Sequence, residues 1–282
     1  MIVVGGSASK SLSGELARQL GCKLADVEIK RFPDEECYVK VQGLGGQDAV
    51  IVQSTYPDPN IVELFLLQEA VRDAGAATIT TVVPYYGYAR QDKSFNDGEA
   101  VSALIMAKHL GQGCDRVFTI DIHNPSVLVG FAVPVQNLSA MPIIGNWLKE
   151  NDVDVIVSPD EGSKDRASLA AEAAQCPWDF LQKTRLDGET VEIKPKNLDV
   201  RGKSVAIVDD IIATGGTMIT AANQLKEQGA SNVIAACTHG LFTGGSIPKL
   251  EAAFDTVIST DTLERSTSKI SAAKAITEAL ES

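Results

Sequence analysis

Short runs of β-branched residues alternate with segments of helical period along almost the whole chain. Residues 1–4 predict a strand, and the apolar residues of 12–20 then recur on one helical face. In 60–74 the apolar residues recur at spacings of three and four before Gly75, which is typical of a helix that ends at a glycine. Strands that alternate with helices predict mostly parallel sheets covered on both faces. The predicted fold class is therefore α/β.

The same pattern continues through both halves of the chain. Further strands are expected at 24–31, 37–41, 49–53, 78–83 and 116–122, and then at 153–158, 178–182, 190–194, 204–208, 232–238 and 255–259. Further helices are expected at 98–110, 141–150, 163–175, 216–228 and 268–280. Two halves of similar length and rhythm predict two like domains, 1–142 and 143–282. The last helix could pack back on the first domain.

Composition and charge restrict the classes of function. The chain has 282 residues, 44% hydrophobic and 22% charged, which is typical of globular proteins and long enough for about two domains. A formal net charge of −12 without a basic patch disfavours a nucleic-acid partner. The five cysteines form no CxxC pair, which favours reduced thiols. With no signal-peptide pattern and no long apolar run, we expect a cytoplasmic protein without a membrane partner.

The strongest motif is the stretch 205–218, VAIVDDIIATGGTM. An apolar strand ends in Asp209 and Asp210, and a turn rich in threonine and glycine then opens a helix. The glycines let the backbone approach a ligand, and the N–H groups and dipole of the helix favour a phosphate. The two carboxylates suit sugar hydroxyls better than a phosphate. These residues predict a site for a ribose 5-phosphate group, against the alternative of an ordinary strand–turn–helix junction.

Two glycine-rich segments lack the full pattern of a nucleotide-binding loop. Residues 5–11, GGSASKS, follow a strand and precede a helix, but Val4 and Ser9 stand where the Walker pattern requires glycine. Residues 111–113, GQG, lack the third glycine of a dinucleotide fingerprint and are typical of a helix end. We expect neither segment to carry function.

Other polar residues follow predicted strands, where open α/β sheets bind ligands. In the motif DIH, Asp121 and His123 are two apart at a strand end, so both side chains could point at one site. In the motif SPDEG, Asp160 follows another strand. A metal site from His123 and Asp160 is plausible, although Mg²⁺ prefers oxygen and has few protein ligands. Alone, His123 would be explained as a hydrogen-bonded histidine at a strand end.

Three further segments carry cations in a chain that is poor in them. Residues 84–93 combine aromatic rings with two cations, and residues 31–36 combine a cation, a ring, a proline turn and carboxylates. Either segment could equally be a solvated loop. Lys183 and Arg185, at a predicted strand end, could reach toward a phosphate as a mobile clamp or could form an ordinary exposed strand end.

Taken together, these motifs resemble the ribose-phosphate pyrophosphokinase (phosphoribosyl pyrophosphate synthetase) family, in its short archaeal-type form. The similar motifs occur in order over nearly the whole chain: RFPD at 31–34, YARQDK at 88–93, DIH at 121–123, SPDEG at 158–162, KTR at 183–185 and VDDIIATGGT at 208–217. The last motif is shared with phosphoribosyltransferases generally. The resemblance implies two phosphoribosyltransferase-like (type I) domains with central, mostly parallel sheets, related by a pseudo-twofold axis.

The resemblance also implies an activity, which is transfer of the diphosphoryl group of Mg·ATP to the 1-hydroxyl of ribose 5-phosphate, with release of AMP, for nucleotide biosynthesis. Mg²⁺ is the implied cofactor. A homo-oligomer, either a dimer or a multiple of dimers, is implied because the 31–36 segment of the family reaches the adenine site of a neighbouring subunit. By motif, the implied site residues are catalytic Lys183 and Arg185; Phe32, Asp34, Glu36, Arg90 and Gln91 at ATP; Arg185, Asp209, Asp210, Ala213, Thr214, Gly215, Gly216 and Thr217 at ribose 5-phosphate; and His123 and Asp160 at the metal.

The chain departs from the family pattern at two places. Glu35 stands where the family usually has glycine, which adds a charge and a Cβ near the nucleotide, and residues 94–100 match only loosely. Two other functions stay open, a non-catalytic paralogue that serves as a regulatory partner and a phosphoribosyltransferase that consumes the diphosphate sugar. The presence of the cationic pair and of both metal-site residues favours the enzyme over the paralogue. The ATP-like segments of the first half disfavour the transferase.

Overall fold

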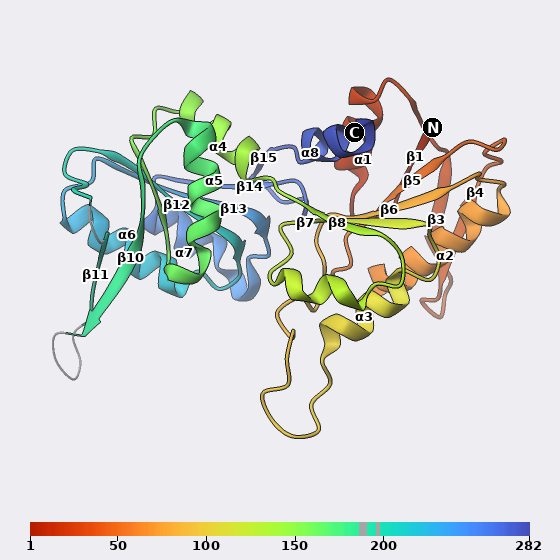
Figure 1. Ribbon diagram of the computed structural model, residues 1–282, viewed down its shortest axis with the longest axis horizontal. Helices are drawn as coiled ribbons and strands as arrows, with labels where there is room; N and C mark the ends of the chain where they lie inside the picture. Colours follow the sequence, from red (N-terminus) through yellow and green to blue (C-terminus); the bar gives the residue numbers. More distant parts are fainter. Residues whose placement is uncertain (186–190, 196–197) are drawn as a thin grey trace. The chain divides into compact units, whose positions relative to one another are not determined.

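The computed structural model describes residues 1–185, 191–195 and 198–282, with the backbone alone at 183–185 and 191–194. The chain divides into two compact units. Unit 1 comprises Met1–Ser139, Asp261–Glu264 and Ser271–Ser282, and unit 2 comprises Ala140–Thr260 and Arg265–Ile270. Both units are α/β, as the alternating pattern predicts (Figure 1). The two halves of the sequence prediction meet at 142/143, whereas unit 2 begins at Ala140, just before helix α4 (Met141–Glu150).

Unit 1 is built on a six-stranded sheet in which all neighbouring strands are parallel. Its order is β2 (Lys23–Leu24), β1 (Ile2–Gly5), β5 (Ala49–Val52), β6 (Ile79–Val83), β7 (Arg116–Ile120) and β8 (Val135–Leu138). Helices α2 (Pro59–Asp73) and α3 (Ser102–Leu110) lie on one face, and α1 (Lys10–Gln19) and α8 (Ala273–Glu281) on the other (Figure 1). Leu64, Leu67 and Val71 of α2 are fully buried in the core of this unit. They are the residues whose spacing predicts the helix.

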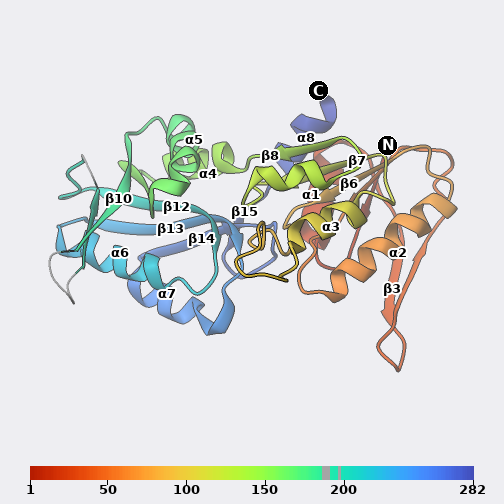
Figure 2. The same ribbon diagram turned by 60° about the horizontal axis from the view of Figure 1, so that its bottom comes forward.

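A β-hairpin stands outside this sheet. It consists of β3 (Val27–Arg31) and β4 (Cys37–Val41), which pair antiparallel, and it contacts α2. Figure 2 shows the hairpin extending from unit 1, with its loop at the far end. The single strand expected at 24–31 is therefore wrong, because β2 joins the main sheet at residues 23–24 and the chain then leaves the sheet to form the hairpin.

Late segments of the sequence complete unit 1. Helix α8 packs on α1, and the Thr277 hydroxyl donates to Gln19 Oε1 at 3.2 Å. The Glu264 carboxylate accepts the Ser11 N–H at 2.6 Å, at the start of α1. The helix expected at 268–280 is wrong at its beginning, because 268–270 form strand β15 and the helix starts at Ala273.

Unit 2 contains a seven-stranded sheet that is parallel except at one edge. Its order is β11 (Val191–Pro195), β10 (Trp178–Arg185), β9 (Val155–Ser158), β12 (Ser204–Ile212), β13 (Asn232–Gly240), β14 (Thr256–Thr260) and β15 (Ser268–Ile270), with β10 and β11 antiparallel. Helices α4 and α5 (Lys164–Ala174) cover one face, and α6 (Gly216–Glu227) and α7 (Ile247–Ala253) cover the other (Figure 1). Alternate residues of β12 enter the two cores, since Val205 and Ile207 belong to one and Ala206 and Val208 to the other.

Several predicted boundaries differ from the structure. The strand expected at 204–208 continues to Ile212, so it includes both aspartates of the DD motif. The helix expected at 98–110 begins only at Ser102, after Gly98 has taken a left-handed backbone with φ of +84°. The sequence pattern predicts neither strand β8 nor helix α7. In the described part of the chain, no helix combines the length and apolar character that crossing a bilayer requires.

Candidate active site

Each sheet has one point where the strand order reverses, and α/β sheets bind ligands outside the carboxyl ends of the strands at such a point. In unit 1 the point lies between β1 and β5, and in unit 2 it lies between β9 and β12. The two points are built differently. The difference indicates which unit offers the sugar-phosphate site.

In unit 1 the reversal point is filled by side chains of the protein. Glu63, on α2, is 1% exposed and accepts hydrogen bonds from the Ser7 N–H at 2.7 Å, the Ser7 hydroxyl at 2.6 Å and Gln53 Nε2 at 2.8 Å. Gln53 Oε1 in turn accepts the Ala8 N–H at 3.0 Å. A protein carboxylate therefore takes the donors that a phosphate loop would offer to its ligand. This agrees with the missing Walker glycines in 5–11.

In unit 2 the reversal point carries three carboxylates. Asp160 follows β9 and is exposed, and its Oδ1 accepts the Ser163 N–H at 3.2 Å. Asp209 Oδ1 accepts the Ser163 hydroxyl at 2.8 Å, so Ser163 connects the SPDEG loop to strand β12. Asp210, next along β12, is only 3% exposed. Asp209 and Asp210 thus lie beside the loop that carries Asp160, as the parallel neighbours β9 and β12 require.

An ion pair balances one of the two adjacent aspartates. Arg166 Nη2 lies 3.0 Å from Asp210 Oδ2, with the two side chains 19% and 4% exposed. Burial, and after it the negative charge of Asp210, raise the pKa of Asp209 from 3.8 to about 7. Asp209 can therefore donate a hydrogen bond near neutral pH as well as accept one. Sequence reasoning missed Arg166, although it lies one helical turn after Ser163 on the predicted helix.

The turn 213–217 presents the N-terminus of α6 to solvent. Gly215 is the N-cap residue, with φ of +73°, and it makes no side-chain cap because it has no side chain. Glycine is required here, since a Cβ would also lie 2.7 Å from Leu250 Cδ2. Thr214, Gly216 and Thr217 are exposed. The arrangement offers backbone N–H groups, hydroxyls and the positive end of a helix dipole to an anion.

Two of the residues predicted to bind ATP lie beyond the carboxyl end of another strand of unit 1. Arg90 and Gln91 follow β6 and line a cavity of about 430 Å³. The backbone of this loop is fixed by the neighbouring strand end, since the Gly87 N–H donates to Thr55 Oγ1 at 2.7 Å. The exposed ring of Tyr88 is held by a hydrogen bond from its hydroxyl to Asp58 Oδ1 at 2.9 Å. Tyr88 itself has φ of +66°, which turns the chain just before Arg90.

The loop of His123 differs from its prediction. Strand β7 ends at Ile120, and Asp121 takes a left-handed backbone with φ of +38°. Asp121 is buried and accepts the Ser139 hydroxyl at 2.8 Å, whereas His123 is exposed. The expectation that Asp121 and His123 share a face is therefore wrong, because the chain turns between them. His123 alone of this pair reaches the surface of unit 1.

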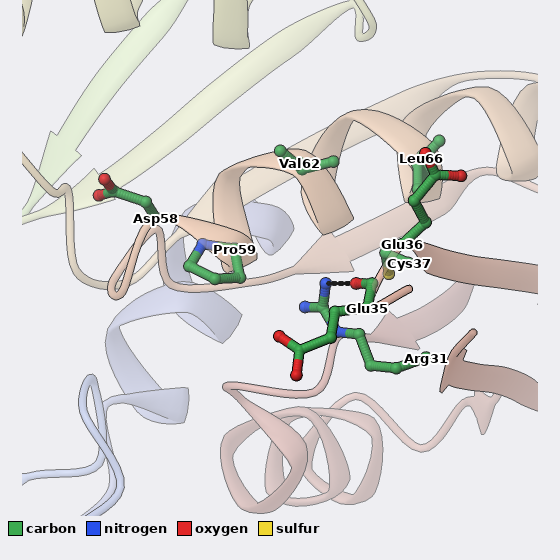
Figure 3. A pocket seen from close by; sticks show the side chains of 8 residues that line it. All are labelled: Arg31, Glu35, Glu36, Cys37, Asp58, Pro59, Val62 and Leu66. Carbon is green, nitrogen blue, oxygen red and sulfur yellow. Dashed lines mark hydrogen bonds between the residues drawn. The ribbon is translucent and has the colours of Figure 1, made fainter. Parts of the chain in front are cut away.

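The hairpin tip carries the remaining ATP-site residues of the prediction, Phe32, Asp34 and Glu36, all of them exposed. Phe32 packs edge-on against Tyr38 at 5.7 Å between ring centroids, and Glu35 has φ of +69°. A cavity of about 570 Å³ lies between the hairpin and the start of α2, and Figure 3 shows Arg31 reaching the Glu35 carbonyl, at 3.2 Å, beside it. Its lining residues are Arg31, Glu35, Glu36, Cys37, Asp58, Pro59, Val62 and Leu66. Asp58 lines both this cavity and that of Arg90.

The structure brings only some of the predicted residues together. Asp160, Asp209, Asp210 and the turn 213–217 surround one strand-order reversal in unit 2. The side chains of Lys183 and Arg185 lie outside the described residues, although the backbone places both on β10 opposite Ile193 and Val191 of β11. Within the described ranges, no group of three or more His, Cys, Asp and Glu residues could hold a metal ion by itself. The shared metal of His123, in unit 1, and Asp160, in unit 2, stays a prediction.

Comparison with known proteins gives matches over nearly the whole chain. The family model described as the N-terminal domain of ribose phosphate pyrophosphokinase matches residues 1–113, and the phosphoribosyl transferase domain matches residues 140–263. The ribose-phosphate pyrophosphokinase of Methanosarcina mazei is 44% identical over 99% of this chain and 94% of its own length. That of Methanopyrus kandleri is 40% identical over 100% and 99%. The crystal structure of phosphoribosylpyrophosphate synthetase from Mycobacterium smegmatis, 27% identical, superposes with a TM-score of 0.84 over 99% of this chain and 97% of that one.

Proposed function

The chain belongs to the ribose-phosphate pyrophosphokinase family, a family of transferases in nucleotide biosynthesis, and from this membership we propose its reaction. The enzyme transfers the diphosphoryl group of Mg·ATP to the 1-hydroxyl of ribose 5-phosphate. The oxygen of that hydroxyl attacks the β-phosphorus, the bond from the β-phosphorus to the bridging oxygen of the α-phosphate breaks, and AMP leaves. The products are 5-phosphoribosyl 1-diphosphate, AMP and the proton of the hydroxyl.

One observation carries the sugar-phosphate half of the proposal. The paired carboxylates of Asp209 and Asp210 stand beside the exposed N-terminus of α6, at the strand-order reversal of unit 2. A helix N-terminus binds a phosphate, and carboxylates bind vicinal hydroxyls. Ribose 5-phosphate contains both groups on one small molecule. The turn 213–217 would hold the 5-phosphate, and the two aspartates would hold the ring hydroxyls.

The nucleotide half rests on unit 1. Arg90 and Gln91 offer a cation and an amide at the 430 Å³ cavity, which is also lined by the rings of Tyr56, Tyr85 and Tyr88. Arg90 would pair with the triphosphate and Gln91 would hydrogen-bond to the nucleotide. Phe32, Asp34 and Glu36 would bind adenine, by stacking and by accepting hydrogen bonds from the exocyclic amine. We infer that the exposed hairpin supplies these residues to a neighbouring subunit of a homo-oligomer.

Of the two groups predicted at the metal, the Asp160 carboxylate suits Mg²⁺, because this ion prefers oxygen ligands. Mg²⁺ is usually held by one or two protein groups together with water and substrate phosphates. Asp160 would supply a carboxylate, oriented by its hydrogen bond from Ser163, and His123 would supply a nitrogen. When bound, Mg²⁺ neutralises phosphate charge.

Catalysis then consists of positioning and charge stabilisation, since neither substrate requires a covalent intermediate with the protein. Lys183 and Arg185 would stabilise the negative charge that develops on the transferred group and on departing AMP. Arg166 pairs with Asp210 and orients its carboxylate, which would accept hydrogen bonds from the sugar, while the raised pKa of Asp209 would let that group donate one.

The deciding experiment identifies the nucleotide product. The purified protein is incubated with ATP, Mg²⁺ and ribose 5-phosphate, and the nucleotides are separated by ion-exchange chromatography, with omission of ribose 5-phosphate and the Asp210→Asn variant as controls. AMP that forms only with ribose 5-phosphate supports the proposal, and Asp210→Asn should raise KM for ribose 5-phosphate with little effect on nucleotide binding. ADP as the product would indicate an ordinary kinase. The absence of turnover would indicate the non-catalytic paralogue.

A further inference from the structure

Two loops that the proposed function uses emerge from neighbouring strands of unit 1. Strands β6 and β7 pair in parallel, with Val82 opposite Phe118 and Val83 opposite Thr119. Their carboxyl ends therefore meet at the same edge of the sheet. The nucleotide loop, residues 84–93, follows β6, and the histidine loop, residues 121–124, follows β7.

One side-chain amide joins the two loops. Asn124 Nδ2 donates a short hydrogen bond to Asp92 Oδ2, and both side chains are half-buried. Asn124 Oδ1 accepts the Ser126 N–H at 3.0 Å and so caps the 3₁₀ helix η1 (Pro125–Gly130). Asp92 comes directly after Gln91, and Asn124 comes directly after His123. The hydrogen bond therefore connects the residue after Gln91 to the residue after His123, and the proposed function places both Gln91 and His123 at Mg·ATP.

The bases of both loops are fixed by other contacts. Asn137 Oδ1, on β8, accepts the Ile122 N–H at 2.9 Å, which holds the histidine loop. In the nucleotide loop the Gln91 N–H donates to the Tyr88 carbonyl at 2.9 Å. The hydrogen bond from Asn124 also holds the pKa of Asp92 below its ordinary value. Through Asn124, Asp92 is bonded to the residue that follows His123.

We propose that Asn124 is a positioning residue that fixes the nucleotide loop relative to His123, through its hydrogen bond to Asp92. This inference rests on the proposed function, which uses Arg90, Gln91 and His123 to hold Mg·ATP. With the bond intact, the groups beside it are held at one separation before the substrate arrives. Without this hydrogen bond, the two loops become ordered only when ATP binds, and the cost of ordering them lowers kcat/KM for Mg·ATP. Ribose 5-phosphate, bound by unit 2, is unaffected.

The alternative is that Asn124 serves only as the cap of η1. Asn124→Asp separates the two roles, because aspartate caps helices as well as asparagine but cannot donate to Asp92. We expect this variant to lower kcat/KM for Mg·ATP by ~10–100-fold, the usual cost of removing a supporting residue behind a metal or substrate ligand. KM for ribose 5-phosphate at saturating ATP should stay within about twofold. A normal kcat/KM for Mg·ATP in Asn124→Asp overturns the proposal.

A reciprocal exchange tests the bond itself. Asp92→Asn alone should be mild, since its amide oxygen can still accept from Asn124. In the double variant Asp92→Asn with Asn124→Asp, the amide and the carboxylate exchange places and the hydrogen bond forms in the opposite direction. We expect the double variant to recover most of the activity that Asn124→Asp loses. A double variant as impaired as Asn124→Asp shows that Asn124 does not act through Asp92.

A second measurement needs no turnover. Amide hydrogen exchange in the ligand-free protein should be faster across 84–93 in Asn124→Asp, unchanged in β6, and restored in the double variant. Asn151→Asp, at the end of α4 in unit 2, controls for loss of an amide donor and gain of charge. If Asn124→Asp unfolds, Asn124→Ser replaces it, because serine caps η1 but is too short to reach Asp92. Unchanged exchange across 84–93 overturns the proposal. A wild-type protein that makes no AMP overturns the proposed function, and the exchange data still decide whether Asn124 orders the loop.

Discussion

Asp209→Asn should stabilise unit 2 at neutral and higher pH, and much less in acid. The native structure buries the Asp209 carboxyl beside Asp210, which raises its pKa from 3.8 to about 7. In the unfolded chain the group ionises near its ordinary value. As the pH rises from 4 toward 7, ionisation therefore favours the unfolded state, and above pH 7 the difference is constant. Asparagine has a similar shape and does not titrate, so the substitution removes this penalty.

The magnitude follows from the pKa difference. A change from 3.8 to about 7 is roughly three units, and at 1.36 kcal/mol per unit the full penalty is about 4 kcal/mol. Because the unfolded carboxyl is already partly ionised at pH 4.5, the difference between variant and wild type should grow by about 3 kcal/mol from pH 4.5 to pH 8. Most of this penalty is present by pH 7, so the buried Asp209 carboxyl destabilises wild-type unit 2 at neutral pH.

Urea unfolding, monitored by tryptophan fluorescence, measures the stability of unit 2, which contains Asp209. Both tryptophans, Trp147 and Trp178, belong to unit 2, so the signal reports that unit alone. Glu172→Gln, at an exposed position of α5, is the matched control, and its effect should be below ~0.5 kcal/mol at every pH. If the stability difference between Asp209→Asn and wild type is the same at pH 4.5 and pH 8, burial does not raise the pKa of Asp209 and the reasoning fails.

Four other outcomes are expected. Lys183→Ala should fold normally and lower kcat by ~10³–10⁵-fold with little change in KM, by analogy with a catalytic arginine in phosphoryl transfer, and an unchanged kcat would remove Lys183 from the mechanism. Gly215→Ala should destabilise unit 2 by ~2–4 kcal/mol in urea, from its positive φ and the contact with Leu250; a neutral effect contradicts both causes. Glu35→Gly should stabilise unit 1 by ~0.5–1 kcal/mol in thermal unfolding, because it relieves a φ of +69°; a loss of stability contradicts strain there. The inactive Glu36→Ala and Lys183→Ala proteins are unfolded together and reassembled. About a quarter of wild-type activity should return if the subunits pair isologously and share their active sites. Mixed oligomers without activity would place each site within one subunit.

The hydrophobic pattern predicts the sheet elements well, because buried parallel strands are nearly continuous apolar runs. The runs at 49–53 and 78–83 become neighbouring central strands, and the spacing of 60–74 predicts α2 to within a residue or two. Predictions are weaker where a polar residue continues a strand. Asp209 and Asp210 look like a strand end in the sequence, yet β12 runs on to Ile212 because β13 pairs with it again at Ile211 and Ile212.

The polar partners of the candidate site could not be predicted from the sequence. Arg166 is one cation on a helix, and only the fold places it against Asp210. Asn124 and Asp92 are 32 residues apart and meet because β6 and β7 are neighbours. The family motifs name the residues that we propose to touch ligands, whereas the residues that orient them depend on tertiary contacts. Glu35 is an intermediate case, since the glycine usual at this position matches the positive φ that the structure gives it.

Because unit 1 contains segments from both ends of the chain, it cannot finish folding until unit 2 has been translated. Ser54 Oγ donates to the Thr262 carbonyl at 2.6 Å, and the Ser11 N–H donates to Glu264 Oε1 at 2.6 Å, so the part of unit 1 that is translated before unit 2 needs partners from beyond residue 260. A ribosome that adds ~5–20 residues per second needs roughly 6–24 s to make the intervening chain of unit 2. During that interval the face of the sheet that α8 later covers has no partner from that helix. The unit that is translated first is therefore the last to be finished, and a chaperone that shields apolar surface on nascent chains should bind residues 1–139 throughout this interval.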